Sequence, residues 1–254
     1  MPPSARQSIQ ITSLTLSLKS CPCRSYVRRA EDAYLGRMYK GVIFDIDGTL
    51  VDSNDAHARA WVKAFADEHI TVPFDQVRPL IGMGSDQMVP RLTDVQKDSR
   101  TFKRLGEAWK QHFQAEEMPH LKAQPGVRAL IERLQERGLR LIVGTSADEA
   151  LVADLLRVAG VDDLLTEYTT ASDVESSKPE PDIVQAAVTK LGLAPAEVLM
   201  VGDTPFDIES ARKAGVATVA LRCGGDTHFE GAAAVYADPQ EWLEQLDQSP
   251  LGKG

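Results

Sequence analysis

Residues 41–50 read Gly-Val-Ile-Phe-Asp-Ile-Asp-Gly-Thr-Leu, and this stretch gives the clearest indication of the architecture. Its first four residues form a short apolar run, which predicts a strand buried on both faces. Two carboxylates, Asp45 and Asp47, follow at once, and Gly48 can supply the backbone freedom that a turn needs. Because open α/β sheets bind ligands beyond the carboxyl ends of their strands, this stretch predicts both a sheet and a site at its edge.

The chain after residue 124 alternates between apolar runs and amphipathic stretches. Further strands are predicted at Leu139–Gly144, Leu165–Thr169, Val198–Val201 and Ala217–Leu221. Helices with apolar residues at three-to-four spacing are predicted at Pro125–Arg137, Asp148–Ala159, Pro181–Leu191 and Asp207–Ala214. Glycines that suit a left-handed C-cap follow at Gly138, Gly160, Gly192 and Gly215. This alternation predicts an α/β fold with a Rossmann-like parallel sheet as its core.

One interval lacks the alternation. Residues 54–124 read as almost wholly helical, with amphipathic stretches at His57–His69 and Arg100–Gln114. An all-helical insertion directly after the first strand should lie over the carboxyl edge of the sheet. We therefore predict an α/β core made of residues 39–53 and 125–248, with residues 54–124 inserted as a helical cap domain.

The N-terminal segment, residues 1–38, differs in composition from the rest of the chain. It carries six basic and two acidic side chains, a sum of +4, and its first 30 residues are Ser-rich without an acid. This composition is typical of a transit peptide, but an over-extended start with translation beginning at Met38 is the favoured interpretation. In either case we expect the segment to be poorly ordered and to take no part in the chemistry.

The overall charge and the cysteines limit the classes of partner. The net charge of -9, from 28 Lys and Arg against 37 Asp and Glu, argues against nucleic acid as the main partner. No run of about 18 apolar residues occurs, so no membrane-spanning helix is expected. The three cysteines lack the paired spacing of a zinc site and suit free thiols in a reducing cytoplasm. We expect a cytoplasmic protein that acts as a monomer.

Asp45 and Asp47 carry the first chemical signal. Two carboxylates at the end of a strand can provide a nucleophile and a proton donor, the groups that covalent phosphoryl transfer requires. A solvated acidic loop is the alternative interpretation. The order Asp-x-Asp-Gly-Thr directly after an apolar run favours catalysis.

Two further signals can bind phosphate. Thr145 and Ser146 close a predicted strand ahead of a helix, where hydroxyl and helical N–H groups can bind phosphate oxygens. A hydroxyl residue at such a place is more often a simple N-cap. Lys178 precedes a proline-started helix, where a fixed ammonium could neutralise phosphate and keep a carboxylate ionised. Taken alone, a loop lysine is more often a solvated charge.

The fourth signal predicts a metal site. Asp203 and Asp207 follow the apolar run Val198–Val201, and with Asp45 they would supply the oxygen ligands that Mg²⁺ prefers. The alternative interpretation of each acid is a simple helix N-cap without a role in metal binding. All four signals fall at the predicted carboxyl ends of different parallel strands, so one joint site for phosphate and Mg²⁺ is the better interpretation.

The order of these motifs resembles that of the haloacid dehalogenase-like hydrolase superfamily. The similarity covers about residues 40–240. The motifs Asp-x-Asp-Gly-Thr, Thr, Lys-Pro and Gly-Asp-x-x-x-Asp follow one another there in the same order as in the family. The resemblance implies that Asp45 is the nucleophile that becomes an aspartyl-phosphate, and that Asp47 is the general acid and then the base. It also implies that Thr145 and Lys178 orient and neutralise the phosphoryl group.

The same resemblance implies the metal ligands and the reaction. Asp203 would hold Mg²⁺ together with Asp45 and the backbone carbonyl of Asp47, and Asp207 would be an accessory ligand or would orient Lys178. A Mg²⁺-dependent phosphatase acting on a small phosphorylated metabolite is then expected, with a phosphoglycolate-like or sugar-phosphate-like substrate. A non-catalytic binding module would have lost these acids.

Four residues of the predicted cap are candidates for contacts with the substrate. The entrance His57-Ala-Arg-Ala-Trp61 is similar to that of β-phosphoglucomutase-like members of the superfamily, although His57 and Trp61 could equally pack in the cap core. Gly82 and Gly84 could let the cap backbone approach a small substrate.

Single residues bear on three related activities of the superfamily. A halide leaving group needs no proton, so Asp47 argues against a haloacid dehalogenase. A phosphonate-cleaving relative needs a cap lysine as Schiff base, and Lys63 is present but reads as a solvated helix-surface residue. A mutase needs a basic cap residue where this chain has Ser85, and Arg91 could substitute. The sugar-phosphate mutase is kept as the alternative function.

Overall fold

The computed structural model describes residues 39–252, and the prediction for residues 1–38 lies outside this range. Its centre is one parallel sheet with the strand order β3-β2-β1-β4-β5-β6. The strands are β1 (Gly41–Phe44), β2 (Arg140–Gly144), β3 (Tyr168–Thr169), β4 (Val198–Gly202), β5 (Ala217–Leu221) and β6 (Ala234–Tyr236). The strand order reverses between β1 and β4, and ligands bind at this kind of position in open α/β sheets.

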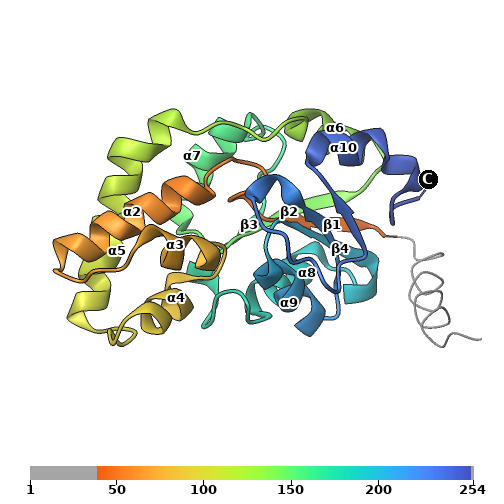
Figure 1. Ribbon diagram of the computed structural model, residues 1–254. Helices are drawn as coiled ribbons and strands as arrows, with labels where there is room; N and C mark the ends of the chain where they lie inside the picture. Colours follow the sequence, from red (N-terminus) through yellow and green to blue (C-terminus); the bar gives the residue numbers. More distant parts are fainter. Residues whose placement is uncertain (1–38, 253–254) are drawn as a thin grey trace, which may run out of the picture. The chain divides into compact units, whose positions relative to one another are not determined.

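Helices cover both faces of the sheet (Figure 1). In that view α6 (Val127–Glu136) and α10 (Pro239–Glu244) lie above the sheet, while α8 (Asp182–Leu191) and α9 (Pro205–Lys213) lie below it. Helix α7 (Glu149–Ala159) connects β2 to β3. Short 3₁₀ turns occur at η4 (Ala171–Asp173), η5 (Pro195–Glu197), η6 (Arg222–Gly224) and η7 (Leu246–Gln248). The α/β prediction, with a Rossmann-like parallel sheet, is confirmed.

The apolar runs of the sequence explain why these elements form. The four residues of β1 are fully buried, as expected for a strand with helices on both faces. Ile43 of β1 packs in one cluster with Ile142 of β2, Met200 of β4 and Val184 of α8. Helix α8 ends at Gly192, whose φ of 62° is the left-handed C-cap conformation that glycine adopts without strain.

Several elements differ from the prediction. Strand β3 is confined to Tyr168–Thr169, because Leu165 donates its N–H to the Val161 carbonyl in a turn and so leaves the sheet. Strand β6 was not predicted, since Ala234–Tyr236 is too short to show a period. Helix α9 begins at Pro205 and not at Asp207, because Thr204 provides the N-cap.

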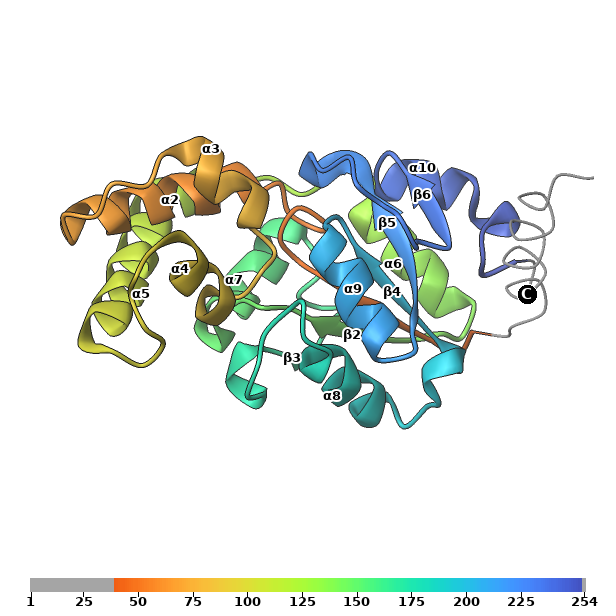
Figure 2. The ribbon, with the colours of Figure 1, turned by 60° about the horizontal axis from the view of Figure 1, so that its bottom comes forward.

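Residues 54–124, which we call the cap segment, contain only helical elements. These are α2 (Asn54–Asp67), α3 (Phe74–Val77), η1 (Arg78–Leu80), α4 (Ser85–Leu92), α5 (Arg100–His112), the π-helical turn η2 (Phe113–Glu117) and η3 (Met118–His120). They enclose a hydrophobic cluster of their own that includes Phe65, Met88 and Leu105. Figure 2 shows these helices grouped apart from the sheet, and we call the remaining described residues the body.

The chain enters and leaves the cap segment at one place. Val51 and Ala123 form an isolated antiparallel bridge, and the Gln124 N–H donates to the Leu50 carbonyl at 2.9 Å. The two connections therefore run side by side next to the end of β1. In residues 39–252 no helix is both long and apolar enough to cross a membrane.

Candidate active site

The loops after β1, β2 and β4 bring the predicted catalytic residues to one edge of the sheet. Asp45 follows β1, Thr145 follows β2 and Asp203 follows β4, while Lys178 comes from the loop that leads to α8. The Asp45 N–H donates to the Val201 carbonyl at 2.9 Å, which continues the pairing of β1 with β4. The sheet thus fixes the backbone of Asp45 directly beside the strand that carries Asp203.

Lys178 forms ion pairs with two of the carboxylates. Its ammonium lies 2.6 Å from Asp45 Oδ1 and 2.8 Å from Asp207 Oδ1, and only 1% of its side chain is exposed. Burial disfavours the ammonium, but the carboxylates of Asp207 and Asp45 raise the pKa of Lys178 above its ordinary value. For Asp45, burial raises the pKa well above its usual range although Lys178 acts to lower it. The lysine therefore stays charged, and Asp45 needs additional positive charge to ionise fully.

Asp203 is held on both of its carboxylate oxygens. Thr49 Oγ1 donates to Oδ1 at 2.9 Å, and Asn54 Nδ2 donates to Oδ2 at 2.7 Å. A Cβ at Gly224 would lie 1.7 Å from Asp203 Oδ2, so only glycine fits against this carboxylate. Burial raises the pKa of Asp203 to about 7. Among the described residues Asp203 forms no ion pair, and the charge of Lys178 offsets the effect of burial only in part.

These carboxylates fit a divalent cation. Carboxylate oxygens of Asp45, Asp203 and Asp207 lie within 4.8 Å of one another, and all three residues are buried. An all-oxygen donor set of this kind suits Mg²⁺, which prefers hard oxygen ligands. The raised pKa values of Asp45 and Asp203 are what uncompensated buried carboxylates show when no cation is bound.

Asp47 lies apart from the three metal-site carboxylates and lines the pocket. Its Oδ1 accepts a hydrogen bond from Ser53 Oγ at 2.6 Å and lies 2.7 Å from His57 Nε2. Burial alone would raise the pKa of Asp47, but the charge and hydrogen bond of His57, with the Ser53 hydroxyl, lower it below its ordinary value. The ring centroids of His57 and Phe113 are stacked 4.1 Å apart, so the cap segment holds His57 in place and, through it, Asp47.

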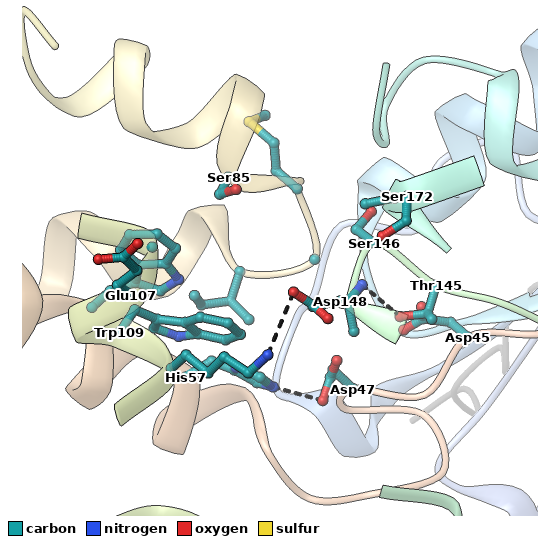
Figure 3. Close-up of a pocket in the computed structure, with 18 of the residues that line it drawn as sticks. Asp45, Asp47, His57, Ser85, Glu107, Trp109, Thr145, Ser146, Asp148 and Ser172 are labelled. Atoms are coloured by element: carbon teal, nitrogen blue, oxygen red, sulfur yellow. Dashed lines mark hydrogen bonds and ion pairs between the residues drawn. The ribbon is translucent and has the colours of Figure 1, made fainter. Parts of the chain in front are cut away.

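A cavity of about 540 Å³ lies between the cap segment and the body (Figure 3). Seven predicted site residues line it: Asp45, Asp47, His57, Trp61, Gly82, Thr145 and Ser146. Figure 3 shows His57 and Trp109 on one side of this pocket and Thr145 and Ser146 on the other. Lys178, Asp203 and Asp207 are buried and do not line it.

The predicted glycines of the cap contact the body. Gly82 has a φ of 98°, and a Cβ there would lie 2.6 Å from Thr204 Cγ2. Gly84 does not line the pocket, and a Cβ there would lie 2.1 Å from the Ser177 Cβ. The Gly84 N–H also donates to the Lys178 carbonyl at 3.2 Å. The absence of side chains here lets the cap segment approach the body closely.

Sequence reasoning missed several residues of the pocket wall. Helix α5 contributes Lys103, Gly106, Glu107, Trp109 and Lys110, and the body contributes Asp148 and Ser172. The three-to-four spacing on α5 was visible in the sequence, but nothing there indicates which helix face is turned toward the body.

Two residues that support other activities lie outside the pocket. Arg91, the substitute for the missing mutase residue, is exposed and does not line the cavity. Lys63, the Schiff-base candidate, pairs with Glu116 and likewise does not line it. The structure therefore provides no support for the roles considered for these two residues.

The fold and the site together define a hydrolase with a Rossmann-like α/β core and a helical cap over buried carboxylates. Residues 42–221 match the family model described as haloacid dehalogenase-like hydrolase. The chain belongs to this family, and it is a phosphatase of the phosphoric monoester type.

Individual relatives cover most of the chain. A phosphoglycolate phosphatase of Rhodospirillum rubrum is 32% identical over 214 residues, which are 79% of this chain and 88% of the relative. Hexitol phosphatase A of Escherichia coli is 31% identical over 191 residues, 74% of this chain and 85% of the relative. The crystal structure of a hydrolase from Pseudomonas syringae superposes with a TM-score of 0.77 at 31% identity, covering 82% of this chain and 98% of that one.

Proposed function

We propose that this phosphatase depends on Mg²⁺ and hydrolyses a small phosphomonoester through an aspartyl-phosphate formed on Asp45. The observation that carries the proposal is the buried ion pair of Lys178 with Asp45, 2.6 Å long, beside Asp203 and Asp207. The cluster of three carboxylates and the phosphate dianion repel each other unless positive charge lies between them. Lys178 supplies one such charge next to the nucleophile.

The chain's residues support two in-line displacements. An oxygen of Asp45 attacks phosphorus, the ester bond breaks, and Asp47 gives its proton to the leaving alcohol. Asp47 then takes a proton from a water molecule, which attacks the aspartyl-phosphate and releases inorganic phosphate. His57 and Ser53 hold the Asp47 carboxylate at the pocket surface throughout. Thr145 and Ser146, which line the pocket, would bind the phosphoryl oxygens, and Lys178 would offset their charge from its place beside Asp45.

Asp45, Asp203 and Asp207 would hold the metal, with the Asp47 backbone carbonyl as a further oxygen donor. Bound Mg²⁺ neutralises phosphoryl charge and polarises the phosphoryl oxygens. Asp207 also orients Lys178, since its Oδ1 lies 2.8 Å from the ammonium.

The substrate class follows from the relatives together with the pocket. The relatives' names describe phosphatases of phosphoglycolate and of hexitols. A phosphoglycolate-like or sugar-phosphate-like ester is therefore the proposed substrate of this chain. Action as a monomer in the cytoplasm stays a prediction, which size-exclusion chromatography and cell fractionation would test.

The test is phosphate release from a panel of small phosphomonoesters, with Mg²⁺ and with a chelator. We expect release that needs Mg²⁺ and that Asp45→Asn abolishes, because the amide cannot act as the nucleophile. Acid-quenched wild type should carry a phosphate that hydroxylamine removes, as an acyl phosphate does.

Asp52→Asn is the matched control. It makes the same chemical change on an exposed carboxylate outside the pocket and should retain full activity. Release without Mg²⁺, or full activity in Asp45→Asn, would contradict the proposal.

A further inference from the structure

Helix α5 presents one row of residues to the pocket. Lys103, Gly106, Glu107 and Lys110 line the cavity, and their three-to-four spacing places them on one face of the helix. The Lys110 ammonium lies 3.7 Å from an Asp148 carboxylate oxygen of the body. Among the described residues Lys103 and Glu107 have no ion-pair partner, although their spacing would allow them to pair. Charged groups of both signs are thus available to a ligand.

Among the described residues, no packing contact explains the glycine at position 106. It lies inside α5, where glycine is less favourable than alanine. A Cβ at this position would meet no atom within 4 Å, so no neighbouring side chain requires a glycine. Because Gly106 lines the pocket, the space that a side chain would fill belongs to the cavity.

The wall beside Gly106 combines an aromatic surface with unsatisfied polar atoms. Trp61 and Trp109 stack with their rings 5.4 Å apart, and both line the cavity. The Trp109 indole nitrogen and the Ser146 hydroxyl are buried and have no hydrogen-bond partner among the described residues. Buried polar atoms are nearly always hydrogen-bonded, so these two indicate where ligand oxygens can lie. Such a wall suits a molecule with both C–H surface and hydroxyl groups.

The volume of the cavity favours the larger of the two substrate classes. 2-Phosphoglycolate has nine non-hydrogen atoms, whereas glucose 6-phosphate has sixteen. The cavity of about 540 Å³ is present while the Gly84 N–H contacts the Lys178 carbonyl and Lys110 contacts Asp148, so the cap segment is already docked. The larger ester would leave less of this cavity unfilled than the smaller one.

We propose that α5 forms a leaving-group subsite that selects phosphomonoesters of six-carbon polyols or sugars over two-carbon phosphoglycolate. Gly106 is the specificity-determining residue, because its missing side chain leaves room for the leaving group next to Trp109. This inference rests on the phosphatase function proposed above.

Phosphate release from sorbitol 6-phosphate, glucose 6-phosphate and 2-phosphoglycolate, with the full chain and Mg²⁺, tests the subsite. We expect the better six-carbon ester to exceed 2-phosphoglycolate in kcat/KM by about tenfold or more. Gly106→Leu should lower the ratio of these two values by roughly 10- to 200-fold, because its side chain fills the subsite. Trp109→Phe keeps the ring, loses the N–H and should lower the ratio as well.

Gln111→Leu is the matched control, because it adds the same side chain at an exposed position of α5 outside the pocket and should leave the ratio unchanged. Gly106→Val, a smaller addition, repeats the measurement if circular dichroism shows that Gly106→Leu fails to fold. A preference for 2-phosphoglycolate, or an equal loss on both esters in the Gly106 variants, would overturn the subsite and leave the phosphatase function standing. Release from no ester would overturn both.

Discussion

At the scale of single residues, Asp47 shows how a cap residue can tune the catalytic acid. The imidazole of His57 lies 2.7 Å from Asp47 Oδ1 and helps to lower the pKa of that carboxyl. A lowered pKa suits the second step, where Asp47 must accept a proton from water. For the first step, protonation has to accompany binding of the anionic ester, whose charge opposes that of the carboxylate.

The variant His57→Phe tests this role, because a phenyl ring can keep the stack on Phe113 while the hydrogen bond to Asp47 is lost. We expect kcat to fall by about 10- to 100-fold, part of the 10²–10⁴ that general acid–base catalysis provides. Without the imidazole the pKa of Asp47 rises, so the acidic limb of the kcat profile should move to higher pH. The inhibition constant of inorganic phosphate should not change. An unmoved pH profile would contradict a role through Asp47.

Mg²⁺ and a proton are expected to compete for the carboxyl of Asp203. Burial raises its pKa to about 7 in the metal-free chain, whereas an unfolded Asp titrates near 3.9. Between these values the folded state keeps a proton that the unfolded state has lost, so this group's contribution to stability falls as the pH rises from about 4 to about 7. Mg²⁺ must displace that proton, and its stabilisation should therefore grow over the same interval.

Thermal unfolding with Mg²⁺ and with a chelator, at about pH 5 and about pH 8, measures this difference. We expect the increase in Tm on adding Mg²⁺ to be larger at the higher pH. Asp203→Asn should lose most of that increase at both pH values. An equal increase in the wild type at both would contradict the competition between metal and proton.

At the scale of elements, the N-cap of α9 connects helix stability to the site. Thr204 Oγ1 accepts from the Asp207 N–H at 3.3 Å, and the Thr204 N–H donates to Asp207 Oδ2 at 3.1 Å, which together form a capping box. Because Asp207 in turn holds Lys178, the cap also positions the lysine. Thr204→Ala should cost about 1 kcal/mol of stability and lower both Mg²⁺ affinity and kcat/KM, while Thr204→Ser restores them.

The control for this prediction is another N-cap. Asp238 accepts a hydrogen bond from the Glu241 N–H at the start of α10, remote in sequence from the catalytic motifs. Asp238→Ala should lose a similar amount of stability in chemical denaturation and keep its Mg²⁺ affinity, measured by calorimetry. A parallel loss of affinity in both variants would show that destabilisation alone is responsible.

The elements also show what the sequence could and could not predict. Glycines such as Gly160 and Gly192 end helices as predicted, because a left-handed residue there is a local requirement. The positions of Asp45 and Asp203 also follow from local rules, since each comes directly after a fully buried strand. The pairing of β1 with β4 and the choice of which α5 face lines the pocket are long-range packing outcomes that leave no local signal.

At the scale of the whole molecule, the cap segment and the body have separate hydrophobic clusters but share the metal site. Leu105 belongs to the cluster of the cap segment and Leu191 to that of the body. Asn54, the first residue of α2, donates to Asp203 Oδ2 at 2.7 Å and to the Gly224 carbonyl at 3.0 Å. A movement of the cap segment at its base is therefore coupled to the position of a metal-site carboxylate, although the body alone supplies the proposed metal ligands.

This arrangement predicts that the two clusters can be weakened with different consequences. Leu105→Ala and Leu191→Ala each remove a fully buried leucine side chain. Each should therefore lower the free energy of unfolding of the part that contains its cluster by about 2–5 kcal/mol. Leu105→Ala should raise KM for the ester and lower kcat, because the leaving-group wall and His57 lose their support. Its inhibition by inorganic phosphate and its stabilisation by Mg²⁺ should stay close to wild type, since both depend on the body.

Leu191→Ala should weaken all four properties as the sheet loosens. If Leu105→Ala impaired phosphate and Mg²⁺ binding as strongly as Leu191→Ala does, the cap segment and the body would be one cooperative unit, and the division of roles between them would be wrong.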